Sequence, residues 1–253
     1  MMKRSALTPK NHVRIAACQV PEFLEDIDGA IASIGAFAKK AERMGVRLLC
    51  FPECFLQGYL LEKIKAERLA FDLSSIEFQD VLMRLPAADI VLVFGLIEKA
   101  EGRLFNTAVV VKNRSLVGRY RKTHLLHGEH IFTAGVDYPI FEINGLRFGI
   151  NICYDINFSA AAFALSTQGA ALILCPANNM MPLEKAEKFR HIHNEVRGKR
   201  SIETGLWLIS SDVTGSREGR ISYGPTAVID PNGCVIAQVP LLAAGLVSAD
   251  IPL

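Results

Sequence analysis

The fold class is decided by the stretch Asn144-Gly-Leu-Arg-Phe-Gly-Ile-Asn-Ile-Cys-Tyr-Asp155. Its Asn144-Gly145 pair suits the positive φ angles of a two-residue β-hairpin turn, which joins the preceding apolar run to a strand over residues 146–152. Cys153 follows this strand directly, and the alanine-rich segment 157–168 predicts a helix. One strand therefore belongs both to a hairpin and to a strand-to-helix turn, which indicates an α/β protein with a mixed sheet.

Alternating strands and helices extend in both directions from this stretch. The pattern predicts strands at residues 13–19, 46–51, 89–98, 104–112, 115–121, 170–175, 206–211, 222–230, 234–239 and 245–251. It predicts further helices at residues 26–44, 71–85 and 182–204. Because hairpins are interleaved with the helices, we expect two mixed β-sheets packed face to face, with the helices outside. No linker interrupts the pattern, so a single domain over residues 1–253 is predicted.

Three of the predicted strands end at a chemically reactive side chain. A carboxylate at Glu53, an ammonium at Lys122 and a thiol at Cys153 each follow an apolar run. Strand ends at one edge of a sheet can converge. Acyl transfer through cysteine needs a base for the thiol proton or a cation that stabilises the thiolate, and Glu53 and Lys122 supply one of each.

The same reaction develops negative charge on the attacked oxygen, for which Lys122 and the backbone N–H of Tyr154 are candidate donors. Taken one at a time, these residues fit structural roles better than catalytic ones: Glu53 as a cap, Lys122 as a solvated strand-end charge and Cys153 as a core thiol. The pattern alone leaves both interpretations open.

Three motifs together closely resemble the catalytic motifs of the nitrilase superfamily of carbon–nitrogen hydrolases. They are Phe51-Pro-Glu-Cys-Phe-Leu-Gln-Gly-Tyr59, Tyr120-Arg-Lys-Thr-His-Leu125 and Gly149-Ile-Asn-Ile-Cys-Tyr-Asp155. Their order and the spacing of the reactive positions, 69 and 31 residues apart, also resemble that family. The resemblance implies a four-layer αββα sandwich that carries a triad of Glu53, Lys122 and Cys153. It also implies hydrolysis of small linear amides through a Cys153 thioester, giving a carboxylic acid and ammonia or an amine, without cofactor or metal.

Further residues take expected roles from the resemblance, which spans about residues 13–251. Glu129 aligns with a second glutamate that helps to position substrate and lysine in such enzymes. Asn178 lies in a Pro-Ala-Asn loop similar to the family's, and Tyr59 closes the first motif. We therefore expect Tyr59, Tyr154 and Asn178 on the substrate side of the site.

Two departures from the family pattern lie near this expected site. Amidase-type relatives often continue after Tyr-Asp with arginine, phenylalanine, proline and glutamate, where this chain has Asn157, Phe158, Ser159 and Ala160. Asn179 and Met180 stand where many relatives have a tryptophan. Both changes point to an altered substrate pocket and leave the triad intact.

The residues after the cysteine, Tyr154-Asp155, are more similar to the amidase and carbamoyl-amidase branches than to true nitrilases. Small linear amides are therefore the first expected substrates, with N-carbamoyl amides or nitriles as alternatives for the same triad.

Three rival functions remain open at this stage. Cys153 could work with a histidine base, either His124 or His127. A zinc enzyme could use ligands from one predicted helix, but the i, i+2 spacing of its histidines puts them on different faces; these ligands would be His191, His193 and either Glu187 or Glu195. A non-catalytic binding module could also keep the fold, since fold alone does not fix function.

Composition excludes several other classes. Half of the residues are apolar, 21% are charged and the net charge is +2, as in an ordinary soluble globular protein. The basic residues are scattered, so no nucleic-acid partner is expected. Cysteines 18, 50, 54, 153, 175 and 234 form no C-x-x-C pair and are predicted to be free thiols.

Targeting signals are also missing from the sequence. No apolar run approaches the ~18 residues of a membrane span, and Met1–Lys10 is not followed by a signal-peptide core. We expect a cytoplasmic protein with a small-molecule amide substrate and no membrane contact, and the resemblance implies a homodimer or higher homo-oligomer.

Overall fold

The computed structural model describes residues 12–253. The strands are β1 (His12–Pro21), β2 (Leu48–Cys50), β3 (Val91–Ala100), β4 (Arg103–Lys112), β5 (Ser115–Arg121), β6 (Phe141–Ile143), β7 (Leu146–Ile150), β8 (Leu172–Pro176), β9 (Met181–Pro182), β10 (Trp207–Arg217), β11 (Arg220–Ser222), β12 (Ala227–Ile229), β13 (Val235–Gln238) and β14 (Gly245–Pro252). The helices are α1 (Ile27–Arg43), α2 (Lys63–Leu69), α3 (Ile76–Arg84), α4 (Ser159–Ser166), α5 (Leu183–Phe189) and α6 (Ile192–Thr204), and η1 (Cys153–Asn157) is a 3₁₀ turn. Met1–Lys10, on which part of the localisation prediction rests, lies outside the described residues.

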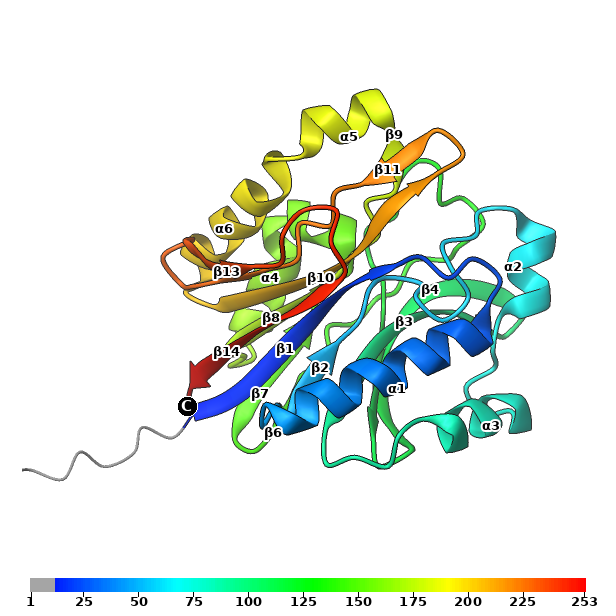
Figure 1. The fold of residues 1–253 in the computed structure, drawn as a ribbon, viewed down its shortest axis with the longest axis horizontal. Coiled ribbons are helices and arrows are strands. Elements are labelled where there is room, and N and C mark those ends of the chain that lie inside the picture. The colour runs from blue at the N-terminus through cyan, green and yellow to red at the C-terminus, as the bar shows by residue number, and fades with distance from the viewer. Residues whose placement is uncertain (1–11) are drawn as a thin grey trace, which may run out of the picture.

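The strands of residues 12–253 are hydrogen-bonded into one mixed, curled sheet (Figure 1). Its main order is β5-β4-β3-β2-β1-β10-β8-β7-β6; β14 pairs with β1, β11 and β12 pair with β10, and β9 and β13 extend the sheet from β11 and β12. Parallel pairs join β3, β2, β1, β10, β8 and β7 in series, whereas β3–β4, β4–β5 and β6–β7 are antiparallel. The mixed α/β class predicted from the sequence is confirmed.

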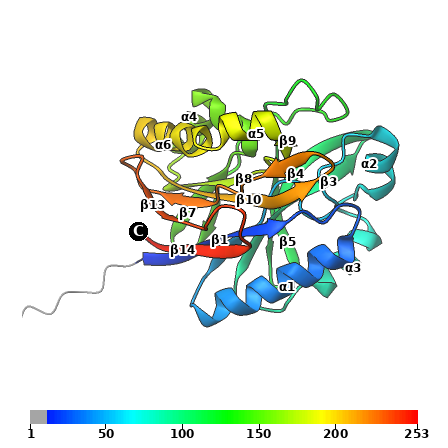
Figure 2. The same ribbon diagram turned by 45° about the horizontal axis from the view of Figure 1, so that its top comes forward.

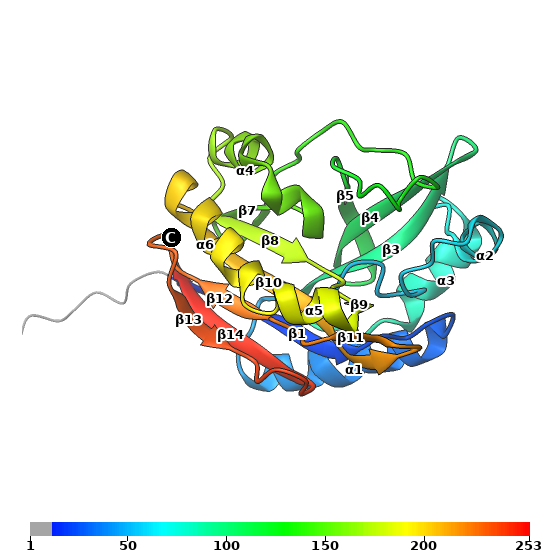
Figure 3. The same ribbon diagram turned by 90° about the horizontal axis from the view of Figure 1, so that it is seen from above.

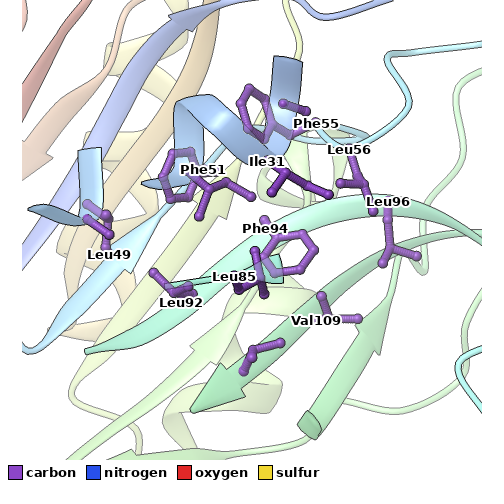
Figure 4. Close-up of a cluster of buried hydrophobic side chains, with 14 of the residues drawn as sticks. Ile31, Leu49, Phe51, Phe55, Leu56, Leu85, Leu92, Phe94, Leu96 and Val109 are labelled. Carbon is purple, nitrogen blue, oxygen red and sulfur yellow. The ribbon is translucent and has the colours of Figure 1, made fainter. Parts of the chain in front are cut away.

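Helices cover two opposite sides of this sheet. Figures 2 and 3 show α1 and α3 on one side and α4 and α6 on the other. On the first side, Ile31 of α1 packs with Phe51, Phe55 and Phe94 in the cluster drawn in Figure 4. On the second side, Leu165 of α4 packs on the β8 and β10 strands.

A third buried cluster joins the two halves of the sheet. It combines Ile15 and Val93 from the β1–β5 half with Phe148 and Leu174 from the β6–β10 half. We expected two sheets; the structure connects the halves into one, through parallel pairing of β1 with β10 at Gln19–Pro21 and 212–214. The full four-layer arrangement stays a prediction.

Local sequence signals account for the element boundaries. The Asp26 carboxylate caps α1 by accepting from the Gly29 N–H at 2.9 Å, and the buried residues of α1 recur along one face. Asn144 and Gly145 have φ angles of 50° and 86°, as a two-residue hairpin turn requires, so the hairpin predicted at this pair is confirmed.

The prediction of one continuous helix over residues 182–204 is wrong. The expected helix at 182–204 is divided into α5 and α6, which are separated at Arg190 and His191. Met181 and Pro182 instead pair with β11. The division coincides with contacts that bind the two helices to different partners: Arg190 lies over the Tyr223 ring, whereas Arg197 of α6 reaches buried polar groups of β10 and Pro225.

Helix length and composition bear on the membrane prediction. Of the helices within residues 12–253, none is long and apolar enough to cross a membrane.

Candidate active site

The candidate residues gather where parallel strands end. Strands β1, β2, β5, β7 and β8 run in the same direction, so their carboxyl ends lie at one edge of the sheet. Shortly after these ends come Glu22, Glu53, Lys122, Cys153 and Asn178, respectively. This edge is where open α/β sheets bind their ligands.

The loop after β2 fixes Glu53 through its aromatic neighbours and through a glycine. Phe51 and Phe55 stack at 5.2 Å between ring centroids and are buried under α1 (Figure 4). Gly95 of β3 donates its N–H to Pro52 O at 3.0 Å, and a Cβ there would lie 2.3 Å from the Cys54 nitrogen. The backbone around Glu53 therefore lies directly on β3.

Glu53, Lys122 and Glu129 form a buried ion cluster. Their side chains are almost fully excluded from solvent. Lys122 Nζ donates to Glu53 Oε1 at 2.7 Å and to Glu129 Oε1 at 2.8 Å. Asn106 Nδ2 donates to the same two oxygens, at 2.8 and 3.2 Å. The structure thus brings together three residues that the sequence singled out and adds one that it did not.

Both carboxylates of the cluster accept further hydrogen bonds. Tyr59 donates its hydroxyl to Glu129 Oε1 at 2.7 Å, and the Leu126 N–H donates to Glu129 Oε2 at 2.6 Å. The Asn178 N–H donates to Glu53 Oε2 at 3.0 Å. Both Tyr59 and Asn178, expected on the substrate side, therefore contact the carboxylates themselves.

Glu22 extends this network by one more charge. It accepts from the Asn178 side chain at 2.9 Å and the Tyr59 N–H at 3.2 Å, and it pairs with Arg217 at 2.6 Å. Its side chain is buried although the residue is absent from the predicted site. It orders the loops that carry Tyr59 and Asn178.

Electrostatics in the cluster favour a protonated lysine and a carboxyl group that takes up a proton readily. Burial raises the pKa of Glu53, and the charge of Glu129 adds to the rise, while Lys122 and Asn106 oppose it. Burial acts to lower the pKa of Lys122, but its interactions with acidic neighbours, Glu53 first, outweigh burial and the pKa is raised. Burial also raises the pKa of Tyr59, which stays a neutral donor.

Cys153 opens the η1 turn with an uncommon backbone conformation. Its φ is 44°, in the left-handed region that non-glycine residues rarely occupy. Burial raises the pKa of the Cys153 thiol, Glu53 raises it further and Lys122 opposes the rise. The resting group is therefore a neutral thiol that interacts electrostatically with both Glu53 and Lys122, so a base is needed to ionise it.

Asp155 ties the cysteine turn to the segment that follows Lys122. Its buried carboxylate accepts from the Ile152 N–H at 2.9 Å, the Tyr120 hydroxyl at 2.7 Å and the His124 N–H at 2.8 Å. His124 Nδ1 also lies 3.1 Å from Asp155, and its ring stacks on Phe158. His124, one of the two histidines of the first rival function, thus has a structural partner in the cysteine turn.

Tyr154 and the altered positions lie on the other side of the turn. The Tyr154 ring packs edge-on against Phe158 at 5.2 Å. Where a family proline and glutamate are replaced, Ser159 accepts a hydrogen bond from the buried Arg200. At the other departure, Asn179 donates its backbone and side-chain N–H groups to the buried Asp212.

The residues considered as zinc ligands differ in exposure and in hydrogen-bond partners. His191 is exposed and accepts from Arg190, whereas burial and the nearby Arg197 lower the pKa of His193 to about 3. Glu187 is bonded to the Tyr223 hydroxyl. Among residues 12–253, no three His, Cys, Asp or Glu side chains are grouped so that they could hold a metal ion.

Sequence reasoning missed Asn106, Asp155 and Glu22 as members of the site. Asn106 had a usable signal, because an amide inside the apolar strand 104–111 must find buried partners. Asp155 lay within one of the three motifs, but its five donors and its contact with His124 Nδ1 could not be read from spacing. Glu22 gave no signal beyond its place after β1.

Comparison with known proteins gives consistent results. The model of the carbon–nitrogen hydrolase family matches residues 14–253. A nitrilase from Pyrococcus abyssi is 29% identical over 231 residues, covering 89% of this chain and 84% of the relative. An (R)-stereoselective amidase from a Pseudomonas species is 29% identical over 193 residues, covering 76% and 68%. An amidase structure from Nesterenkonia sp. aligns with a TM-score of 0.81 over 98% of this chain and 93% of that chain at 24% identity, which shows a shared fold.

Proposed function

This chain belongs to the carbon–nitrogen hydrolase family, and from that premise we propose that it hydrolyses small linear amides with Cys153 as nucleophile. The observation that carries the proposal is the buried cluster of Glu53, Lys122 and Glu129, which acts electrostatically on the Cys153 thiol. A cluster of this kind supplies both the base and the cation that cysteine chemistry needs.

The first half of the reaction forms a thioester. Glu53 accepts the thiol proton as Cys153 Sγ attacks the amide carbon, and Lys122 and the Tyr154 N–H stabilise the negative oxygen. The carbon–nitrogen bond then breaks, and Glu53 returns its proton to the leaving nitrogen, which departs as ammonia or an amine. The raised pKa of Glu53 suits a group that must both take and give this proton.

The second half releases the acid. Glu53 accepts a proton from water as the water oxygen attacks the thioester carbon. The carbon–sulfur bond breaks, the carboxylic acid leaves, and the proton on Glu53 returns to the Cys153 sulfur. Glu129 transfers no proton in this scheme; it accepts hydrogen bonds from Lys122, Asn106, Tyr59 and the Leu126 N–H.

Nitriles are the second candidate substrates. The similarity to the Pyrococcus abyssi nitrilase favours them, and the same triad would attack a nitrile carbon. N-carbamoyl amides are a third class that cleaves at the same kind of bond.

An ammonia-release screen over aliphatic amides, ω-amides of dicarboxylates, N-carbamoyl amines and nitriles tests the proposal. We expect turnover of at least one amide and a loss of at least ~10³-fold in Cys153→Ala, since removing a nucleophile leaves only binding and oxyanion effects. Undiminished turnover in that variant would refute the thiol scheme.

A labelling experiment supplies a substrate-independent control. Cys234 is exposed and would react with iodoacetamide on its own, so the measurement uses a Cys234→Ala background. Cys18, Cys50, Cys54 and Cys175 are buried, whereas Cys153 is partly exposed and has Glu53 as its proposed base. Labelling confined to Cys153 is the expected result, whereas uniformly slow labelling would favour a non-catalytic binding module.

We also propose that the two sheet halves are the inner layers of an αββα sandwich in one domain, since they share a buried cluster and carry helices on their outer sides. A cytoplasmic location and a homodimer are further proposals that rest on the sequence and the family resemblance.

A further inference from the structure

We propose that Asn106 is a positioning residue of this site, whose side-chain amide holds Glu53 and Glu129 in their charged arrangement around Lys122. The proposal rests on the role proposed above for Glu53 as the base that serves Cys153. It extends that role to a residue on the middle of strand β4, away from the three sequence motifs.

The geometry around Asn106 is a four-atom diamond. Two donors, Lys122 Nζ and Asn106 Nδ2, each contact the same two acceptors, Glu53 Oε1 and Glu129 Oε1. The amide nitrogen carries two hydrogens, one for each carboxylate. Asn106 is fully buried. Its backbone carbonyl accepts from the backbone N–H of Lys122 at 2.8 Å, so the backbone of Asn106 also positions the start of the segment that carries Lys122.

Charge explains why an amide suits this position. Two carboxylates and one ammonium leave one excess negative charge in a site closed to solvent, which burial penalises. A neutral group with two hydrogens stabilises both carboxylates without a further charge. A carboxylate in the same place would repel them, and an aliphatic side chain would leave them with Lys122 as their sole shared donor.

The orientation of the amide follows from the same contacts. Asn106 Oδ1 is buried and has no hydrogen-bond partner within the described residues. Turning the amide over would place this oxygen against two carboxylate oxygens and remove both donors. The carboxylates therefore favour one orientation of the Asn106 amide. In that orientation its nitrogen lies between the two carboxylates and donates to both.

One chemical consequence is measurable. The hydrogen bond from Asn106 lowers the pKa of Glu53, against burial and the charge of Glu129, which raise it. Without Asn106, Glu53 would bind a proton at higher pH and would no longer accept one from Cys153 in mildly acid solution. A residue that merely fills space would not produce this shift.

The test compares Asn106→Leu with the parent in the Cys234→Ala background. The rate of Cys153 alkylation by iodoacetamide and kcat/KM for the best amide are both measured against pH. We expect the midpoint of the acid limb to rise by about one pH unit, with a roughly tenfold lower rate below it, as loss of a charge-assisted hydrogen bond implies. Asn106→Asp, which keeps the shape, should raise the midpoint at least as far.

Thr107→Val is the matched control. Thr107 is the next residue of β4, is equally buried and loses one hydrogen bond to Glu98 at 2.8 Å in this variant. It should lower the melting temperature without moving the acid limb. An unmoved limb in both Asn106 variants would overturn the proposal, and if Asn106→Leu fails to fold, Asn106→Asp decides alone. Alkylation needs no substrate, so a shifted limb without amide turnover would uphold Asn106 while refuting the proposed function.

Discussion

At Glu53, burial and neighbouring charges act in opposite directions on one carboxyl group. Burial and Glu129 raise its pKa, whereas Lys122 and Asn106 lower it. The Cys153 thiol is neutral at rest for the same reason, since burial outweighs the ammonium. Because the thiol is neutral at rest, Glu53 must accept its proton during the reaction; Cys153 and Lys122 do not form a preformed thiolate–ammonium pair.

The pH profile of the enzyme should follow from this assignment. Glu53 must be ionised to act as a base, so activity is lost as pH falls through its pKa, which lies above the ordinary 4.5. Lys122 has a raised pKa and stays charged, so no alkaline loss is expected below 10.5. Values of kcat/KM, determined from initial rates between about pH 4 and about pH 10, measure both limbs of the profile.

Glu129→Gln should shift the acid limb of this profile to lower pH. Removing the Glu129 charge removes a contribution that raises the pKa of Glu53, so the acid midpoint should fall. An acid midpoint at or below 4.5 in the unmodified enzyme, or a rise in Glu129→Gln, would contradict the assignment.

The sequence predicted reactive side chains better than their partners. Glu53, Lys122 and Cys153 follow recognisable strands and lie in motifs, so their convergence was expected. Asn106 contacts Glu53 and Glu129, and Asp155 contacts Tyr120 and His124, all of them 23 or more positions away; such pairs depend on strand order rather than on local pattern. The rise in the Cys153 pKa could not be predicted either, because it depends on burial.

At the level of elements, the site depends on how closely the loop after β2 approaches β3. A Cβ at Gly95 would lie 2.3 to 2.7 Å from backbone atoms of Cys54, Pro52 and Glu53. Hydrogen bonds on both sides of Gly95, to Pro52 O and from the Leu56 N–H, are each 3.0 Å long. The loop cannot move away without losing them.

Gly95→Ala should therefore damage activity more than its size suggests. We expect a loss of about 2–3 kcal/mol in unfolding free energy from overpacking. The displacement of Glu53 should also cost roughly 100-fold in kcat/KM. Gly35→Ala is the control, because a Cβ at that position of α1 meets nothing within 4 Å. Chemical denaturation and initial rates are measured on both; equal activity in the two variants would refute the close-approach argument.

Element boundaries were predictable where the chain itself carries the signal. The turn at Asn144-Gly145 and the cap at Asp26 both rest on local residues, and the predicted turn is confirmed. The division between α5 and α6 has no such signal. It accompanies contacts with Tyr223 and Pro225, which lie about thirty residues further along the chain.

For the molecule as a whole, β1 is the strand that unites the two halves. It pairs with β14 along most of its length, with β2 at Ile15–Ala17 and with β10 at its end. Ser211 of β10 adds a side-chain hydrogen bond to Cys18 O at 2.6 Å. Strand periodicity predicted these elements but not this junction, because it carries no information on which strands pair.

Gln19 of β1 tests how much this junction contributes to stability. Its fully buried amide donates to Pro240 O and Ala243 O, each at 2.8 Å, and accepts from the Thr226 N–H at 3.2 Å. Gln19→Leu would remove these three hydrogen bonds. The Thr226 N–H and Pro240 O keep backbone partners in Gly224 O and the Ala243 N–H, whereas Ala243 O loses its Gln19 donor. With one carbonyl left without its donor and two weakened contacts, unfolding should become easier by about 1–2 kcal/mol, a fall of roughly 2–8 °C in melting temperature for a chain of this size.

Gln168→Leu is the control for Gln19→Leu, because it is the same substitution at an exposed position. Gln168 also donates to two carbonyls, Tyr138 O at 2.9 Å and Ala164 O at 2.8 Å, but at an exposed position where water can replace it. Its loss should therefore change stability by about 0.5 kcal/mol or less. Because Gln19 contacts none of the groups around Cys153, the folded Gln19→Leu protein should keep the acid limb of the alkylation profile. Equal melting temperatures for the two variants would mean that the C-terminal segment is held to β1 by strand pairing with β14 and not by this buried amide.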